Sequence, residues 1–89
     1  MHKITVMSKP RCHLCEVALK VIEMVIAPRG PVLIEEMDIT QDQELLEKYH
    51  DAIPVVLVDG KERFRHTVDA DALAKLLYDE PGERLVGIS

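Results

Sequence analysis

The chain has 89 residues, a formal net charge of −5, and 47% hydrophobic and 30% charged residues. This length suits one small domain, and the composition is that of a soluble globular protein rather than a disordered one. The acidic balance argues against nucleic acid or an anionic membrane as the main partner, and no apolar run is long enough to span a bilayer.

The first part of the chain predicts a strand, a helix and a second strand. Residues 2–7 contain the β-branched run Ile4-Thr5-Val6, which favours a strand. After Cys12, apolar residues recur at helical spacing as far as Ile26 and predict a helix that is mostly covered, as one packed on a sheet would be. The prolines within residues 28–31 end that helix, and residues 32–37 predict the next strand.

The second part predicts a helix, a β-hairpin and a last helix. Thr40 and Gln43 fit a capping box, in which the Thr40 hydroxyl accepts from the Gln43 backbone N–H at the start of a helix through Tyr49. Residues 55–58 predict a buried central strand, joined by the Asp59-Gly60 turn to a returning strand at 61–65. Asp69 is placed to cap the third helix, with Val68 and Leu73 as a hydrophobic staple.

This order of elements predicts an α/β fold with a four-stranded mixed sheet and helices on both faces. The opening strand–helix–strand unit requires parallel strands, and the hairpin adds antiparallel pairs. We assign residues 1–80 to one domain and residues 81–89 to a C-terminal tail without a helical or strand period.

Cys12 and Cys15 are the only cysteines of the chain, and they stand where a helix is expected to begin. The N-terminus carries no stretch resembling a secretory signal, so we expect a cytoplasmic location, where a C-x-x-C pair more often binds metal or does redox chemistry than forms a structural disulfide. Residues three apart at the start of a helix are neighbours, so a small adjustment closes a disulfide between them.

The position of Cys12 predicts the more reactive thiol. Free backbone N–H groups and the helix dipole favour an anion there, and Lys9, Arg11 and His13 add positive charge nearby. Cys15 lies on the apolar side of the helix, where burial keeps it protonated. We therefore interpret Cys12 as the nucleophile and Cys15 as the resolving thiol of a disulfide exchange.

Other interpretations of the pair stay open at this point. Cys12 and Cys15 also fit half of a metal or iron–sulfur site, with His13, His2 or His66 as further ligands, although the chain has no second Cys or His pair at matching spacing. A third interpretation is a non-catalytic binding domain whose cysteines are inert. Pro54, at the start of a predicted buried strand, is by itself explained as a strand-start proline.

The residues Lys9-Pro10-Arg11-Cys12-His13-Leu14-Cys15, the pair Ile53-Pro54, Gly60-Lys61-Glu62 and residues 69–73 resemble the glutaredoxin family over residues 3–79. The C-x-L-C-E pattern more narrowly resembles small bacterial glutaredoxin-like proteins. The resemblance implies a thioredoxin-like fold and a dithiol–disulfide oxidoreductase of cell redox homeostasis. Such an enzyme reduces protein or glutathione-mixed disulfides and holds no bound cofactor.

The resemblance also implies roles for single residues. Pro54 would be cis and face the cysteine pair, and the Ile53 backbone would pair with an extended substrate or with glutathione. Lys9 would hold a glutathione carboxylate, and Asp69 with the third helix would meet the other end of the tripeptide. The expected substrate-binding residues are thus Lys9, Arg11, His13, Ile53, Pro54 and Asp69.

Two departures from the family pattern bear on glutathione. His13-Leu14 stand where glutathione-binding members carry Pro-Tyr, and Arg65-His66 replace a Gly-Gly whose lack of side chains lets a ligand approach the backbone. Arg65-His66 should crowd that pocket and add positive charge. We therefore expect either glutathione or a thioredoxin-reductase-type reductant as electron donor, a disulfide-containing protein or glutathione as partner, and a monomer.

Overall fold

The computed structural model describes residues 2–78; the tail predicted at residues 81–89 and the domain end predicted at residue 80 lie outside the described residues. The strands are β1 (Lys3–Ser8), β2 (Leu33–Asp38), β3 (Val55–Val58) and β4 (Lys61–Arg65). The helices are α1 (His13–Ile26), α2 (Gln43–Tyr49) and α3 (Ala70–Tyr78), with a short 3-10 helix η1 (Ile39–Gln41) before α2. No helix within residues 2–78 has the length and apolar character needed to cross a membrane.

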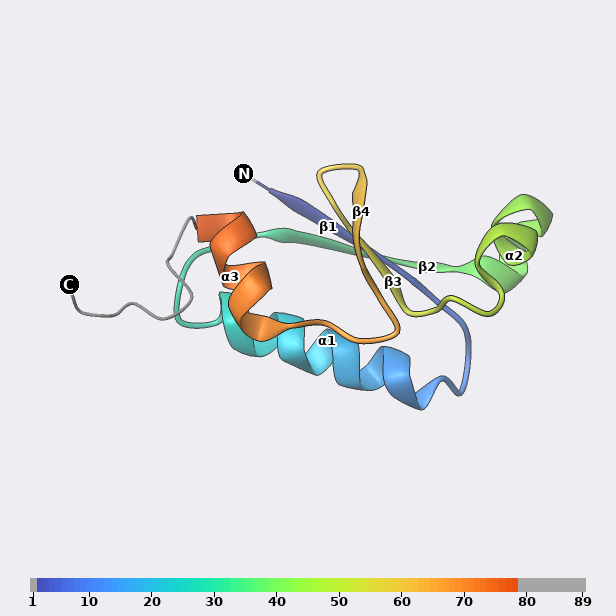
Figure 1. Ribbon diagram of the computed structural model, residues 1–89, viewed down its shortest axis with the longest axis horizontal. Helices are drawn as coiled ribbons and strands as arrows, with labels where there is room; N and C mark the ends of the chain where they lie inside the picture. Colours follow the sequence, from blue (N-terminus) through green and yellow to red (C-terminus); the bar gives the residue numbers. More distant parts are fainter. Residues whose placement is uncertain (1, 79–89) are drawn as a thin grey trace.

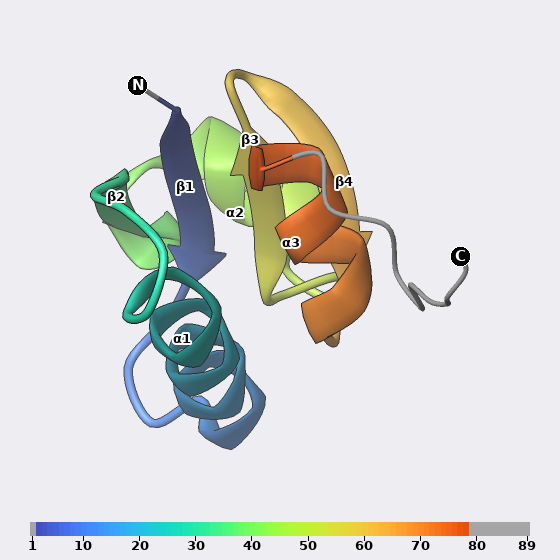
Figure 2. The same ribbon diagram turned by 90° about the vertical axis from the view of Figure 1, so that its left-hand side faces the viewer.

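The strands form one four-stranded mixed sheet in the order β2-β1-β3-β4, which confirms the predicted α/β fold (Figure 1). β1 and β2 are parallel, whereas β3 is antiparallel to both β1 and β4. Figure 2 shows α1 near β1 and α3 near β3 and β4. The central position of β3 explains its burial, since Val55 and Val56 are both fully buried.

Successive side chains of a strand point to opposite sides of the sheet, and two clusters of buried residues pack against it, with α2 at the end of the strands (Figure 1). On one face, Ile4 and Val6 of β1 pack in a cluster with residues of α1 and α3. On the other face, Met7 packs in a second cluster that contains Tyr49 of α2. The cysteine pair belongs to this second cluster, at the end of β1 where the chain enters α1.

The predicted hairpin and the predicted cap of α3 are confirmed. Asp59 and Gly60 have φ values of 53° and 88°, as a two-residue turn of type I′ requires, and Gly60 takes this conformation without steric cost. The Asp69 carboxylate accepts the Ala72 backbone N–H at 3.1 Å, which is N-cap geometry. Val68 packs against the cluster that contains the fully buried Leu73, as a staple would.

The predicted capping box at Thr40 is wrong. Thr40 lies inside η1, which Asp38 caps by accepting the Thr40 backbone N–H at 2.9 Å. Asp42 caps α2 instead, through its carboxylate and the Glu44 N–H at 2.9 Å. Ile39 is fully buried directly after β2. Because this burial places the short helix η1 before α2, Asp42 and not Thr40 stands at the N-cap of α2.

The expectation that α1 is mostly covered is only partly correct. One stripe of the helix, Cys15, Ala18, Ile22 and Val25, is buried. Beside it, however, Leu14, Val17 and Met24 are exposed by 47%, 43% and 73%. Sheet and α3 bury a single side of the helix, and nothing in the described part of the chain covers these three residues.

Candidate active site

Cys12 and Cys15 lie at the N-terminus of α1 and are joined by a disulfide, with their Cα atoms 5.2 Å apart. Cys12 is the N-cap residue, with extended backbone angles of φ −99° and ψ 104°. The Cys15 backbone N–H donates a hydrogen bond of 3.2 Å to Cys12 Sγ. The sulfur thus occupies the position where a helix start stabilises an electron-rich acceptor.

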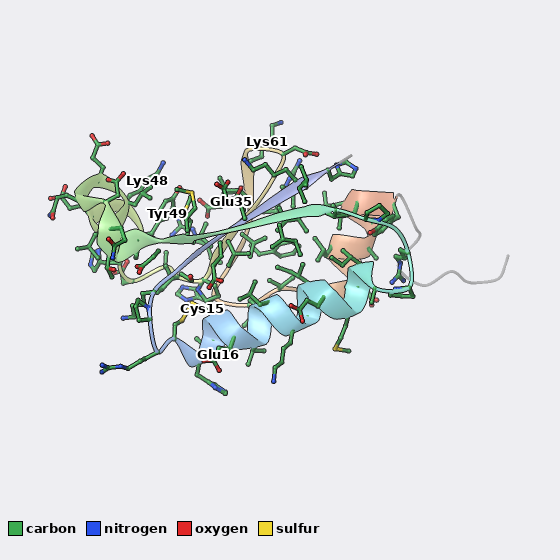
Figure 3. All side chains as sticks on the ribbon, turned by 180° about the vertical axis from the view of Figure 1, so that it is seen from behind. Cys15, Glu16, Glu35, Lys48, Tyr49 and Lys61 are labelled. Carbon is green, nitrogen blue, oxygen red and sulfur yellow. A yellow bond between two sulfur atoms is a disulfide. The ribbon has the colours of Figure 1, made fainter. Side chains whose placement is uncertain are left out.

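The two sulfurs differ in burial. Cys15 is 3% exposed and packs in the cluster with Met7 and Ile53, whereas Cys12 is half-buried at the edge of that cluster. Figure 3 shows Cys15 on the side of α1 that faces the sheet and Glu16 pointing away from it. A partner therefore has access to Cys12 and not to Cys15.

The loop between β1 and Cys12 places the cysteine pair at the start of α1. Arg11 has φ 61°, in the left-handed region that side chains other than glycine rarely adopt, at a cost of about 1–2 kcal/mol. This turn takes the chain from the end of β1 to the N-cap at Cys12. Arg11 and His13 flank Cys12 and are exposed, as the sequence predicted for cations near the thiol.

The Ile53–Pro54 peptide bond is cis, which confirms what the family resemblance implied. Both residues are buried, and Ile53 belongs to the same cluster as Cys15. The Pro54 carbonyl accepts the His66 backbone N–H at 2.8 Å. Within residues 2–78 the Ile53 backbone N–H and carbonyl have no hydrogen-bond partner.

Lys9 lies in a shallow depression whose other polar residues are Ser8, Glu36 and Asp38. The Ser8 hydroxyl donates to Glu36 Oε2 at 3.0 Å, and hydrogen bonds from Thr40 hold the pKa of Asp38 below its usual value. Two carboxylates therefore flank the single lysine. The sequence analysis missed these neighbours, because one of them depends on the parallel register that places Ser8 opposite Asp38, which a single sequence does not specify.

The positive charge expected at Arg65-His66 is partly neutralised, because Arg65 forms an ion pair with Glu62. Arg65 donates a hydrogen bond to Glu62, and this contact raises the pKa of the guanidinium above its usual value. His66 has φ 70°, a left-handed backbone at the place where the family resemblance implied a glycine. Asp69, expected to bind substrate, lies at the start of α3 and is engaged as its N-cap.

The part of the chain that the structure describes contains no group of three or more His, Cys, Asp or Glu residues arranged to hold a metal ion. A disulfide-forming pair of one half-buried and one buried cysteine fits the chemistry of thiol–disulfide exchange.

Comparison of the sequence with known proteins identifies the family of this chain. The sequence profile of the glutaredoxin-like domain (DUF836) matches residues 3–78. The chain belongs to this glutaredoxin-like family. A curated relative, the glutaredoxin-like protein YDR286C homolog of Dictyostelium discoideum, is 32% identical over 77 residues, which cover 81% of this chain and 68% of the relative.

Solved structures show the same fold for this glutaredoxin-like chain. The structural genomics target protein XcR50 from X. campestris matches with a TM-score of 0.67 and 26% identity, covering 88% of this chain and 99% of that one. A mutant thioredoxin from Halobacterium salinarum matches with a TM-score of 0.58 and 22% identity, covering 88% of this chain and 73% of that one. The predicted thioredoxin-like fold is thereby confirmed.

Proposed function

We propose that the protein is a thiol–disulfide oxidoreductase that uses Cys12 and Cys15. The observation that carries this proposal is the hydrogen bond from the Cys15 N–H to Cys12 Sγ at the N-cap of α1. In the reduced protein the same N–H and the helix dipole stabilise the Cys12 thiolate, which lowers the pKa of the Cys12 thiol below its ordinary value. The thiolate is the form that attacks a disulfide.

The exchange proceeds in two balanced steps. The Cys12 thiolate attacks one sulfur of the substrate disulfide, forms a mixed disulfide and expels the other substrate sulfur as a thiolate. Cys15, after losing its proton, attacks Cys12 Sγ and releases the second substrate thiolate. The substrate gains two electrons, and the enzyme is left with the Cys12–Cys15 disulfide seen in the structure.

Reduction of that disulfide requires two electrons from an external thiol. We propose glutathione, two molecules of which become glutathione disulfide, or a thioredoxin-reductase-type reductant as the donor. The setting is the cytoplasm, where the protein acts in cell redox homeostasis as a monomer that needs no bound cofactor. The substrate is a protein disulfide or a glutathione-mixed disulfide.

The surroundings of the pair supply the substrate contacts of this proposal. The unpaired N–H and carbonyl of Ile53, next to the cis Pro54, accept an extended segment as a short strand. Arg11 and His13 attract negative charge beside the sulfur that reacts. We propose that Lys9 and Asp69 each meet a polar end of the substrate.

The test compares variants in the reduction of insulin disulfides driven by dithiothreitol. Cys12→Ser should abolish the reaction above the uncatalysed rate, because no thiolate attacks. Cys15→Ser should stop turnover as well but accumulate a mixed disulfide with the substrate, detectable by mass spectrometry without reductant. Wild-type activity in Cys12→Ser would refute the assignment.

A further inference from the structure

The exposed residues of α1 form a continuous apolar stripe. Leu14, Val17 and Met24 are exposed by 47%, 43% and 73%, and the half-buried Val21 lies between the last two. Spacings of three and four residues place all four side chains along one line of the helix, and we call this line the α1 stripe. Scattered exposed apolar residues are ordinary, but a contiguous set marks an interaction surface.

The stripe begins at the reacting disulfide. Leu14 stands between Cys12 and Cys15 in the chain, and Val17 follows one helical turn after Leu14. Cys12 caps this first turn, so a molecule bound over the turn has Cys12 Sγ at its edge. The groups that flank the disulfide of the partner therefore meet Leu14 and Val17, and a partner large enough extends to Met24.

The charges near the N-terminus of α1 indicate which groups flank the disulfide of the partner. Arg11 and His13 form no ion pair within residues 2–78, in a chain whose net charge is −5. They complement acidic groups next to the partner's disulfide. Glutathione brings negative charge but no apolar side chain for the stripe, and on the other side of the loop Glu36 and Asp38 flank Lys9, where its carboxylate was expected.

We propose that the α1 stripe is the docking surface for protein disulfides, and that it makes the enzyme prefer a disulfide flanked by apolar and acidic side chains over a glutathione-mixed disulfide. The proposal rests on the exchange chemistry of Cys12 and Cys15 and adds the substrate class. Apolar contact over the stripe stabilises the complex with a protein, whereas the tripeptide leaves the stripe in water.

The experiment measures kcat/KM with two substrates, insulin and the mixed disulfide of glutathione and 2-mercaptoethanol, both with dithiothreitol as electron donor. The variants are Val17→Ser, Met24→Ser and the double variant. Leu33→Ser is the matched control, because Leu33 is 58% exposed on β2, outside the stripe and the site. Thermal unfolding of each variant verifies that it is folded.

The decisive quantity is the ratio of kcat/KM for insulin to kcat/KM for the glutathione-mixed disulfide. Val17→Ser should lower this ratio about fivefold and the double variant about tenfold, since each substitution removes apolar contact. Met24→Ser alone should have a smaller effect, as it is farther from Cys12. Leu33→Ser should leave the ratio within about twofold of wild type.

Three outcomes overturn the docking proposal while leaving the exchange chemistry intact. The first is an unchanged ratio in the double variant, and the second is a wild-type enzyme that reduces the glutathione-mixed disulfide faster than insulin. The third is a wild-type dimer in size-exclusion chromatography that the double variant converts to a monomer, because a second copy then covers the stripe. Activity of Cys12→Ser would instead overturn the proposed function itself.

Discussion

The position of Cys12 as N-cap of α1 leads to a quantitative prediction about stability. Cys12 Sγ accepts the Cys15 N–H at 3.2 Å, and removing such a side-chain acceptor costs about 1 kcal/mol. Cys12→Ala removes it, whereas Cys12→Ser keeps an oxygen acceptor in its place. Neither variant forms the disulfide, so their difference isolates the cap. For a domain of this size, about 1 kcal/mol corresponds to a Tm difference of about 4–8 °C in favour of serine.

The assay is thermal unfolding followed by circular dichroism, with reductant present for both variants. Equal Tm values would contradict the reasoning, because the side chain at position 12 would then not cap the helix and the proposed stabilisation of the thiolate would lose its basis. Neither variant should reduce insulin, because both lack the Cys12 thiol. The Tm difference between them therefore reports on the helix cap alone.

A comparison of reduced wild type with Cys12→Ser tests whether the acceptor is an anion. A thiolate accepts more strongly than a hydroxyl, and a thiol whose pKa is lowered by folding contributes stability that is lost as pH falls through that lowered value. The Tm of reduced wild type, relative to Cys12→Ser, should therefore rise as the pH rises toward about 8.5, the ordinary pKa of a thiol. A difference independent of pH would mean that folding does not lower the pKa of the Cys12 thiol.

Three further predictions concern residues outside the cysteine pair. Asp69→Ala should lower the stability by about 1 kcal/mol in urea unfolding, whereas Asp69→Asn, which keeps the cap of α3, should lose only a few tenths; a loss of insulin reduction in the folded Asn variant would show that the charge also binds substrate. Asp59 has its pKa lowered by hydrogen bonds from His2 and the Lys3 backbone N–H, so its contribution to stability is present above its ordinary pKa and lost as pH falls through the lower folded value. Asp59→Asn should accordingly show a flatter Tm profile than wild type below about pH 4, and parallel profiles would contradict the contact. Leu73, fully buried between α3 and the sheet, should lose about 2–5 kcal/mol on mutation to alanine, and a midpoint of urea unfolding close to wild type would show that this core is not packed as described.

The sequence predicts best where the signal is local. The turn at Asp59-Gly60 and the cap at Asp69 depend on residues within a few positions of each other, and both are confirmed. The error at Thr40 shows the limit of such signals. Thr40 and Asp42 both carry acceptors suited to an N-cap, and burial of Ile39 against the second core cluster decides between them.

The candidate site likewise combines features that follow from the local sequence with features that depend on distant parts of the chain. That Cys12 and Cys15 share the first turn of a helix follows from their spacing and from the apolar period after them, because helix geometry makes residues three apart neighbours. Their approach to Ile53 depends on the pairing of β1 with β3, which joins segments more than forty positions apart. A single sequence does not specify such a register.

The amino-acid sequence by itself thus determines the order of the helices and strands, the position of the cysteine pair and the unequal roles expected of its thiols. The tertiary structure decides which side of α1 meets the sheet, and so leaves Leu14, Val17 and Met24 in water beside Cys12. It also places Glu36 and Asp38 next to Lys9 and pairs Arg65 with Glu62. Helical and strand periods are properties of a segment, whereas exposure and charge pairing depend on what the folded chain packs against it.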